Sequence, residues 1–227
     1  MASVSREYPI KEYAIIGNCE TAALVNPDGG IDWLCLPAFD SPSFFAALLD
    51  RDKGGSFVLR PSVPYQVERQ YEDNSAILRT RFATRDGSVE VVDFFVVARR
   101  KKARFYDFTS LYPARKLVRM VSADAAAEIP MELVLEGRPD YAAGESRWQR
   151  MGDKGWNYSS NEARFHANMP VRLDGDRLRG SFTVSRGKQY FTVLDYGDNP
   201  VLPDGNAVDQ WLRVTRAFWR EWNLFNY

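Results

Sequence analysis

The sequence predicts an all-β fold, a large antiparallel β-sandwich followed by one C-terminal helix, and three observations lead to it. Short runs of alternating apolar and polar residues, separated by turn residues, recur until about residue 196. The chain shows neither the strand–helix alternation of a parallel sheet nor a repeat of fixed period. Beyond residue 204 the spacing of apolar residues changes from that of a strand to that of a helix.

The first elements come from residues 20–50, ETAALVNPDGGIDWLCLPAFDSPSFFAALLD, which predict a strand, a tight turn, a second strand and a short helix. The turn falls at Gly29 and Gly30, because glycine accepts the positive φ that a tight turn needs. With the turn placed there, Val25 lies opposite Ile31 in the hairpin. This register fixes which side chains of the two strands face one another.

The same register bears on the two cysteines. Cys35 faces Thr21, so Cys19 is offset from Cys35 by two positions, which is too far for a disulfide bond. We therefore expect two buried free thiols, as in a reducing compartment. The N-terminal residues MASVSREYPIKEY lack the apolar stretch of a secretory signal, and no apolar run reaches the length of a membrane helix. The sequence predicts a cytoplasmic protein with no membrane partner.

The second strand of this stretch and the segment after it carry most of the special residues. Trp33 and Leu34 point to opposite faces of the strand, so one of them fills the core. Two prolines stiffen the end of the strand. Residues 44–50 are then expected to form the short helix, with Ser41 or Ser43 as its N-cap.

The later strands are predicted from the same alternation. Residues 76–82 and 89–97 flank an Asp-Gly turn, and the second run is apolar on both faces, which indicates a strand covered on both sides. In residues 171–180 a two-residue Asp-Gly turn sets Leu173 opposite Asp176. About ten strands result, and the remaining ones are expected at 105–112, 116–122, 131–137, 162–168 and 188–197.

Residues 207–222 predict an amphipathic helix with Asn206 as its N-cap. The apolar residues of one face are Val208, Trp211, Leu212, Phe218, Trp219 and Trp222. Because large exposed apolar patches are uncommon on soluble monomers, we expect this face to pack on the sandwich or on a neighbouring molecule in a homo-oligomer. The predicted domains are residues 1–203, the sandwich, and residues 204–227, a linker helix.

Composition and residue types argue against several classes of function. Thirty basic and thirty acidic residues cancel without a basic face, so no nucleic-acid partner is expected. His166 is the only histidine, and with two cysteines it supplies neither a metal site nor a catalytic triad. The chain has no glycine-rich phosphate loop, so no cofactor is predicted. Most acidic residues lie at turns or on solvent-facing sides of strands, which makes a small complete hydrolase the least favoured hypothesis.

Four blocks of the sequence carry a family resemblance. They are GNCETAALVNPDGGIDWLCLPAFDSPSFFAALLD, VEVVDFF, LVRMVSADAAAEIPMELVLEGRPDYA and AFWREW. In this order they resemble the N-terminal region of glycoside hydrolase family fifteen, which includes prokaryotic glucoamylases and glucoamylase-like trehalases. The resemblance implies a β super-sandwich, a linker helix and a six-fold α/α-barrel that carries two catalytic glutamates. Because this chain stops at the linker, the resemblance implies that no catalytic residue lies within it.

The leading hypothesis is therefore a non-catalytic accessory domain whose partners are its own catalytic barrel and an α-glucoside substrate. We expect the rim of the sugar pocket to include Trp33, Phe39, Asp40 and Ser41, on a rigid segment at a strand end. In this hypothesis the carboxylate of Asp40 accepts hydrogen bonds from sugar hydroxyls or from a barrel arginine. The residues expected at the domain interface are Trp211, Phe218, Trp219 and Trp222.

Two departures from the family pattern fall near this rim. Glu20 stands where family members usually carry a basic residue, and Ala38 stands where they usually carry an arginine. The loss of the arginine at Ala38 bears on any substrate-facing role of the loop, and it leaves two alternatives: a different specificity or a degenerate homologue. The alternative hypothesis is a free-standing sandwich that binds sugar or protein partners through aromatic residues such as Trp148, Trp156 and Tyr158.

Overall fold

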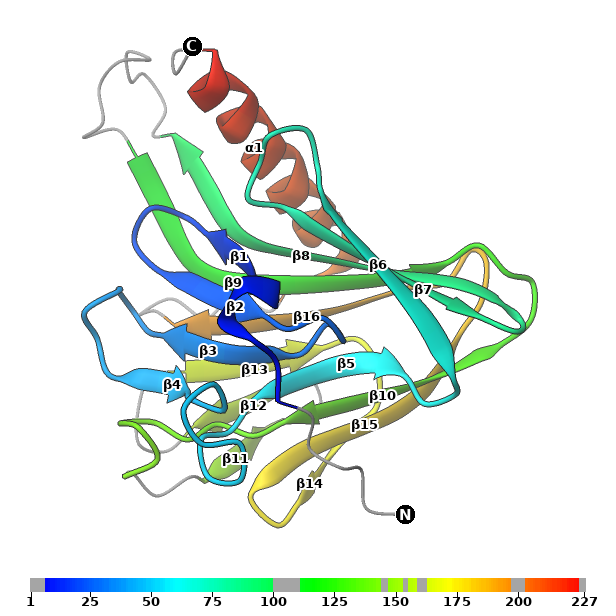
Figure 1. Ribbon diagram of the computed structural model, residues 1–227, viewed down its shortest axis with the longest axis horizontal. Helices are drawn as coiled ribbons and strands as arrows, with labels where there is room; N and C mark the ends of the chain where they lie inside the picture. Colours follow the sequence, from blue (N-terminus) through cyan, green and yellow to red (C-terminus); the bar gives the residue numbers. More distant parts are fainter. Residues whose placement is uncertain are drawn as a thin grey trace.

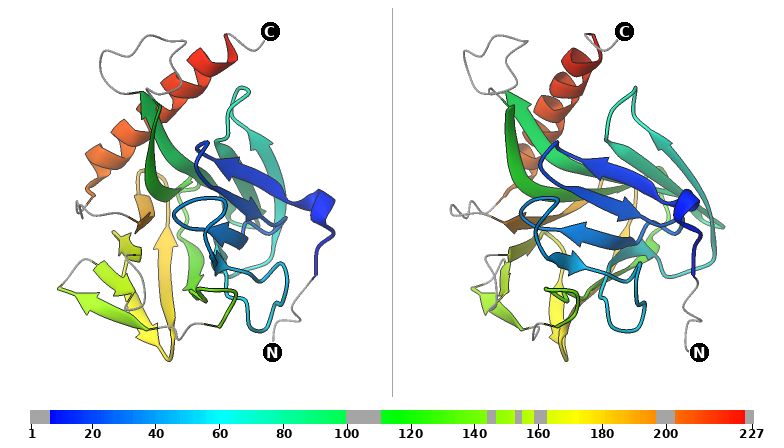
Figure 2. Two further views of the ribbon diagram at one scale, coloured as in Figure 1. Left: turned by 90° about the vertical axis from the view of Figure 1, so that its left-hand side faces the viewer. Right: turned by 60° about the vertical axis from the view of Figure 1, so that its left-hand side comes forward.

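A computed structural model describes residues 7–99, 111–143, 147–152, 155–158, 163–196 and 203–224. In these residues two antiparallel sheets pack face to face, and one α-helix lies against the outside of the second sheet (Figure 1). The prediction of an all-β sandwich with a C-terminal helix is therefore confirmed. The chain path is also followed in the two turned views of Figure 2.

The first sheet, sheet A, has the strand order β1-β2-β3-β5-β10-β15-β14, and β4 pairs with β3. A short 3-10 helix, η1 (Ile10–Glu12), precedes it. The strands of sheet A are β1 (Ala14–Gly17), β2 (Ala22–Val25), β3 (Ile31–Cys35), β4 (Ser43–Phe45), β5 (Phe57–Pro61), β10 (Ile129–Leu135), β14 (Val171–Asp174) and β15 (Arg177–Val184).

The second sheet, sheet B, has the strand order β11-β12-β13-β16-β9-β8-β7-β6. The long strands β8 and β9 pair with each other near the middle of this sheet (Figure 1). The strands of sheet B are β6 (Tyr65–Tyr71), β7 (Leu78–Thr84), β8 (Gly87–Arg99), β9 (Leu111–Ala123), β11 (Trp148–Met151), β12 (Gly155–Tyr158), β13 (Ala163–Ala167) and β16 (Gln189–Tyr196).

The main core lies between the two sheets, and the alternation of the sequence supplies it. Along β10, Leu133 and its two second neighbours are buried, whereas Glu132 points outward. Phe57 of β5 contributes from the same sheet, and Phe95 and Val121 contribute from sheet B. Burying such side chains stabilises the fold by about 1.5–3 kcal/mol each relative to leaving them exposed.

A buried ion pair of sheet B lies within this apolar core. Arg119 of β9 donates two hydrogen bonds to Asp93 of β8, at 2.8 and 3.1 Å, and neither side chain is exposed to solvent. The same guanidinium donates to the carbonyl oxygen of Phe57 at 2.8 Å and to that of Gly29 in the β2–β3 turn. Arg119 therefore links sheet B to two positions of sheet A, and its charge is fully paired.

The outer face of sheet B is also apolar, because both faces of β8 are. Val92, Phe94 and Val96 form a second cluster there with side chains of β9 and β16. The helix α1 (Gly205–Asn223) covers this cluster with Val208 and Leu212. The expectation that β8 is covered on both sides is confirmed. The helix was expected to pack either on the sandwich or on a neighbouring molecule, and in the structure it packs on the sandwich.

Polar contacts fix the second half of α1. The buried hydroxyl of Thr215 accepts a hydrogen bond from the backbone N–H of Val97 at 3.2 Å. Arg216 donates two hydrogen bonds to Glu72, which also accepts two from Arg79 of β7 at 2.9 and 3.1 Å. Although burial opposes it, the hydrogen bonds and charges of the two arginines hold the pKa of Glu72 below its usual value.

Strand β1 forms one edge of sheet A, and a side chain of sheet B reaches it. The hydroxyl of Tyr71 accepts a hydrogen bond from the N–H of Ile15 at 2.7 Å and donates one to its carbonyl oxygen at 2.9 Å. Arg69 donates to the carbonyl oxygen of Val25 at 3.0 Å and to that of Glu12 at 2.6 Å. Strand β6, at the edge of sheet B, thus holds the N-terminal strands of sheet A in place.

Several predicted details are wrong. Residues 44–50 form β4 and a turn instead of a helix, because Phe44 and Phe45 are fully buried in the sandwich. The N-cap of α1 is Asp204, whose carboxylate accepts a hydrogen bond from the N–H of Ala207 at 2.8 Å, and Asn206 lies within the helix. The described residues contain sixteen strands, more than the ten expected. Several strands are only four residues long, which is too short for alternation to indicate them.

The predicted register of the hairpin in residues 171–180 is wrong. Leu173 pairs with Leu178, so the turn residues of the β14–β15 hairpin are Gly175 and Asp176. Gly175 has a φ of 65°, a left-handed conformation that glycine adopts at a lower energetic cost than other residues do. Most of the strand expected at 105–112 lies outside the described residues.

Candidate functional site

The predicted rim residues lie at one end of the sandwich, near two connections within sheet A and the segment that leaves β10 toward sheet B. We call this region the loop end and define it as residues 18–21, 36–42 and 138–143. The β1–β2 turn and the β3–β4 loop both project toward the left in Figure 1, and that side faces the viewer in the left panel of Figure 2. The loop end is therefore built from segments far apart in the sequence.

A bulge in β3 sets the direction of Trp33. Val25 pairs with Ile31 as predicted, but Leu24 pairs with Trp33, so Asp32 is an extra residue on β3. The bulge lets Ile31 and Leu34 both face the core, while Trp33 points to the outer face of sheet A and is half-buried. It also shifts every later residue of β3 by one position relative to the predicted hairpin.

A buried polar cluster fixes the bulged residue. Oδ2 of Asp32 accepts hydrogen bonds from the hydroxyl of Tyr13 at 2.8 Å, from Arg51 at 2.8 Å and from the amide of Asn26 at 2.9 Å. Only 1% of Asp32 is exposed. Burial, together with the hydrogen bond to Asp32, raises the pKa of Tyr13, so its phenol stays protonated and donates. Because an unpaired buried carboxylate is costly, these partners hold the bulge.

On the outer face, Trp33 packs against Tyr141. The ring centroids are 6.2 Å apart and the planes are tilted by 46°. Tyr141 belongs to a run of three residues with positive φ, Asp140–Ala142, and its N–H donates to the hydroxyl of Ser43 at 3.1 Å. Non-glycine residues rarely adopt this conformation, so the turn is held by its contacts with β4. The result is a fixed aromatic pair, of which Tyr141 is 55% exposed.

The loop between β3 and β4 is held in one conformation by its own hydrogen bonds. The N–H of Ala38 donates to the hydroxyl of Ser41 at 3.1 Å, and the N–H of Ser41 donates to the carbonyl oxygen of Ala38 at 3.1 Å. The N–H of Phe39 donates to the carbonyl oxygen of Glu20 at 3.0 Å, which ties the loop to the β1–β2 turn. The peptide bond between Leu36 and Pro37 is cis.

This fixed loop presents two side chains to solvent. Phe39 is 62% exposed, and Asp40 is exposed as well. Within the described residues neither side chain has a ring contact, hydrogen bond or ion pair with another side chain. Ser41 uses its hydroxyl within the loop. Of the four predicted rim residues, the structure thus places Phe39 and Asp40 outward, Ser41 in support, and Trp33 on the adjoining sheet face.

The two departures from the family pattern also lie here. Glu20 accepts hydrogen bonds from Arg115 of β9 at 3.1 and 3.3 Å, so its charge is balanced locally. Ala38 sits inside the hydrogen-bonded loop. Cys19 is exposed, which corrects the expectation of two buried thiols, whereas Cys35 is buried and both cysteines are free. Partial burial raises the pKa of both thiols.

An apolar strip continues from the loop end over the outer face of sheet A. Ile15 pairs with Leu24 and Leu24 pairs with Trp33, so their side chains form a row across β1, β2 and β3. Tyr141 extends the row. We call these four residues the apolar strip. Ile15 is 57% exposed and nothing within the described residues covers it, so this face differs from the outer face of sheet B.

The aromatic residues of the alternative hypothesis are placed differently from what that hypothesis needs. Trp148 and Tyr158 are 3% and 2% exposed and stack edge-to-face at 4.9 Å within the core. Trp156 is half-buried. Trp148 and Tyr158 stabilise the sandwich, because both pack against Phe44, and Trp148 also packs against Phe165, rather than face solvent. The structure therefore gives no support to a sugar-stacking platform at Trp148 and Tyr158.

The expected domain-interface residues all lie on α1. Phe218 is buried, and Trp211, Trp219 and Trp222 are half-buried. Phe218 contacts the rings of Trp219 and Trp222 at 5.1 and 5.7 Å. Lys116 lies over the ring of Trp211 at 5.8 Å. These contacts account for the helix on sheet B, and a further role of the same residues at a domain interface stays a prediction.

Two further features, a metal-binding cluster and a membrane-spanning helix, are absent from the described residues. They contain no group of three or more histidine, cysteine, aspartate or glutamate side chains arranged to hold a metal ion. The described helices include none with the length and apolar character needed to span a membrane. His166 is buried in β13, as expected for a strand histidine.

Comparisons with known proteins show the family to which this chain belongs. The family described as "Trehalase-like, N-terminal" matches residues 3–163. A trehalase of Mycolicibacterium smegmatis is 28% identical over 94% of this chain and 34% of its own length. A trehalase of Mycobacterium tuberculosis is 28% identical over 96% of this chain and 34% of its own length. Trehalase 2 of Sulfolobus acidocaldarius is 41% identical over 42% of this chain and 16% of its own length.

Among solved structures, a putative kojibiose phosphorylase from the human microbiome shows a weak likeness, with a TM-score of 0.36 and 10% identity over 98% of this chain and 28% of that chain. The chain spans about a third of the length of the mycobacterial trehalases that it matches. The resemblance seen in the sequence is thus confirmed by a family match over most of the chain. The chain belongs to the trehalase-like N-terminal domain family of glycoside hydrolases.

Proposed function

We propose that this chain is a non-catalytic accessory domain of an α-glucoside hydrolase of the trehalase or glucoamylase type, and that it packs against and supports a catalytic α/α-barrel. The observation that carries the proposal is the alignment of nearly the whole chain with about a third of two trehalases. The other two thirds of those proteins leave room for a separate catalytic domain. The exposed free thiol of Cys19 supports action in the cytoplasm, a reducing compartment.

The loop end is the surface that we assign to contact with the catalytic domain. Its loop is fixed by hydrogen bonds, and it presents an exposed aromatic ring at Phe39 and an unpaired carboxylate at Asp40. A fixed loop loses little conformational freedom when it binds, which favours it as part of a pocket rim. The adjoining apolar strip offers area for packing. In this arrangement Asp40 accepts hydrogen bonds from a sugar or from a basic side chain of the partner.

The first test is the activity of the chain by itself. We expect the purified 227-residue chain to hydrolyse neither trehalose nor maltose at a rate above that of a buffer control. Turnover that co-purifies with the chain and disappears when one of its own carboxylates is replaced would overturn the accessory role. Sedimentation velocity on the same sample shows whether the inactive chain is folded and monodisperse.

The second test places the loop end in an active enzyme. The first third of the Mycolicibacterium smegmatis trehalase is replaced by this chain, and kcat/KM for trehalose is measured with and without Asp40→Ala. We expect Asp40→Ala to lower kcat/KM by about tenfold, the loss of one charged hydrogen bond at about 1.4 kcal/mol, at an unchanged Tm. Asp86→Ala, at the exposed β7–β8 turn, is the matched control. Equal activity of the two variants would reduce the loop end to a structural element.

A further inference from the structure

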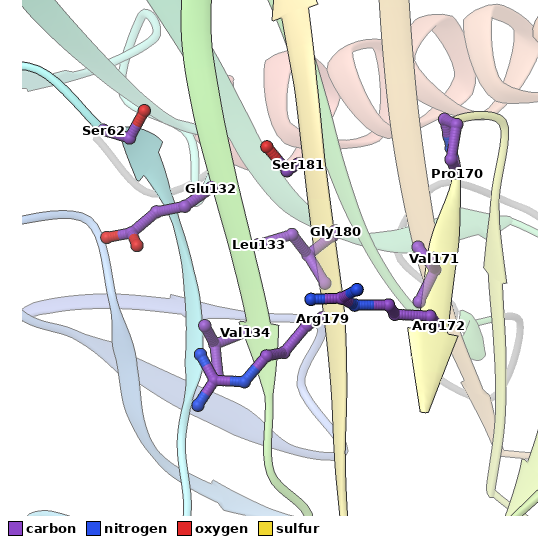
Figure 3. A pocket seen from close by; sticks show the side chains of 10 residues that line it. All are labelled: Ser62, Glu132, Leu133, Val134, Pro170, Val171, Arg172, Arg179, Gly180 and Ser181. Carbon is purple, nitrogen blue, oxygen red and sulfur yellow. The ribbon is translucent and has the colours of Figure 1, made fainter. Parts of the chain in front are cut away.

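A groove on the outer face of sheet A has a chemistry that the accessory role does not use. It lies over β10, β15 and the edge strand β14, has a volume of about 530 Å³, and contains no residue of the loop end. Volumes of this size are typical of small-molecule sites. Figure 3 shows Arg172 reaching from β14 toward β15, Arg179 extending from β15 over β10 in the opposite direction, Ser181 on β15, and Ser62 on the same side of the view as Glu132.

Two arginines of the groove lie at opposed positions of neighbouring strands. Arg172 of β14 and Arg179 of β15 are direct register partners and both line the groove. Like charges at directly opposed positions of neighbouring strands are destabilising. Such a pair is relieved by acidic neighbours or by a bound anion, so the partners of each arginine decide between these outcomes.

The acidic neighbours are largely used by other arginines. Glu136 and Asp176 pair with Arg138 and Arg177. Asp174 forms an ion pair with Arg179, with 2.7 Å between its carboxylate oxygen and Nε, although this contact lacks the alignment of a hydrogen bond.

Arg172 has no hydrogen-bond or ion-pair partner among the described residues. Of the two guanidinium groups, that of Arg172 is therefore left without a counter-charge among the described residues.

The other polar groups of the groove also favour an anion. The carboxylate of Glu132 is paired with Arg60 at 2.7 Å, which neutralises the one acid lining the groove. The hydroxyls of Ser62 and Ser181 have no partner among the described residues. Two guanidinium groups and two hydroxyls thus offer hydrogen-bond donors to the same space.

We propose that this groove binds a small ligand through a phosphate or carboxylate group. Guanidinium groups match the oxygens of both anions in a two-pronged geometry, and hydrogen bonds between charged groups are the stronger ones. Arg172 holds the anion through its unpaired guanidinium group, and the bound negative charge relieves the repulsion between Arg172 and Arg179. Ser181 and Ser62 donate to the remaining oxygens or to hydroxyls of the ligand.

The test measures binding to the full chain at constant ionic strength. Inorganic phosphate, glucose 6-phosphate, glucuronate and glucose are titrated by calorimetry, and Tm is followed in parallel. We expect both or one of the two sugar anions to bind and neutral glucose not to bind. A preference between glucose 6-phosphate and glucuronate identifies which anion the groove takes.

Three variants locate the site. Arg172→Met should weaken anion binding by about tenfold or more, and Arg172→Lys, which keeps the charge but loses the planar fork, should give an intermediate loss. Arg213→Met, an exposed arginine of α1, is the control and should leave binding unchanged. Anion binding that is equal in Arg172→Met and the unaltered chain would overturn the proposal, as would binding of glucose as tight as that of its phosphate. Loss of anion binding leaves the accessory role untouched, since the two sites share no residue.

Discussion

The outer faces of the two sheets differ although both sheets contribute to one core. Sheet B carries an apolar cluster on its outer face, and α1 covers it with Val208 and Leu212. Sheet A carries the apolar strip, whose Ile15 is 57% exposed, and farther along its face a set of paired charges. An apolar face that the chain covers itself stabilises the fold, whereas an uncovered one is available to a partner. The difference separates the part of the domain that maintains its structure from the part that we assign to binding.

The largest expected effect comes from removing the counter-ion of Arg119, the buried side chain that links the two sheets. Asp93→Ala leaves Arg119 buried without its counter-ion, and we expect the free energy of unfolding to fall by about 3–5 kcal/mol. Urea denaturation followed by circular dichroism measures the loss. The double variant Asp93→Ala with Arg119→Met removes both charges and should recover part of it. A single variant within 1 kcal/mol of the unaltered chain would show that the pair does not hold the sheets together.

A smaller effect compares the two outer faces directly. Leu212→Ala empties a site beneath α1 and should lower the free energy of unfolding by about 3 kcal/mol. Ile15→Ala removes a similar volume from the exposed apolar strip and should cost about 0.5 kcal/mol, within the range of strand propensities. Equal losses in urea denaturation would mean that the apolar strip is as well packed as the helix face, and the comparison would fail.

A third prediction, smaller than the loss expected beneath α1, is pH-dependent and concerns only the covered face. Because the pKa of Glu72 is lowered in the folded protein, its contribution is fully present above the unfolded value of about 4.3 and is lost as pH falls through the folded value. At pH 7 we expect Glu72→Gln to cost about 1 kcal/mol. The gap in Tm between the variant and the unaltered chain should close toward pH 3. A gap that persists there would assign the effect of Glu72 to packing.

Alternation and turn chemistry were sufficient to predict the class of fold and most of its hairpins. They predicted the pairing of Val25 with Ile31 but not the extra residue at Asp32. That bulge depends on Tyr13 and Arg51, which lie 19 residues away on either side of Asp32 and meet it only in the folded chain. Local patterns contain no information on such contacts, so the outward direction of Trp33 was left open between two faces.

The errors have related causes. Residues 44–50 have good helix formers, but burial of Phe44 and Phe45 between the sheets outweighs local propensity. The predicted N-cap, Asn206, lies inside α1, because the carboxylate of Asp204 accepts the hydrogen bond from the N–H of Ala207 and starts the helix two residues earlier. The groove arginines were missed altogether, because the register that opposes Arg172 to Arg179 follows from a turn placed one residue away from the predicted one.

The hydroxyl of Tyr71 has a consequence for how molecules of this protein behave toward one another. Strand β1 ends sheet A, and the unpaired N–H and C=O groups of an end strand are a template on which another chain can add a strand. At Ile15 both of these groups are already occupied by the phenol of Tyr71. A single oxygen atom from sheet B thus seals the position where strand addition, and with it self-association into extended β-structures, would otherwise start.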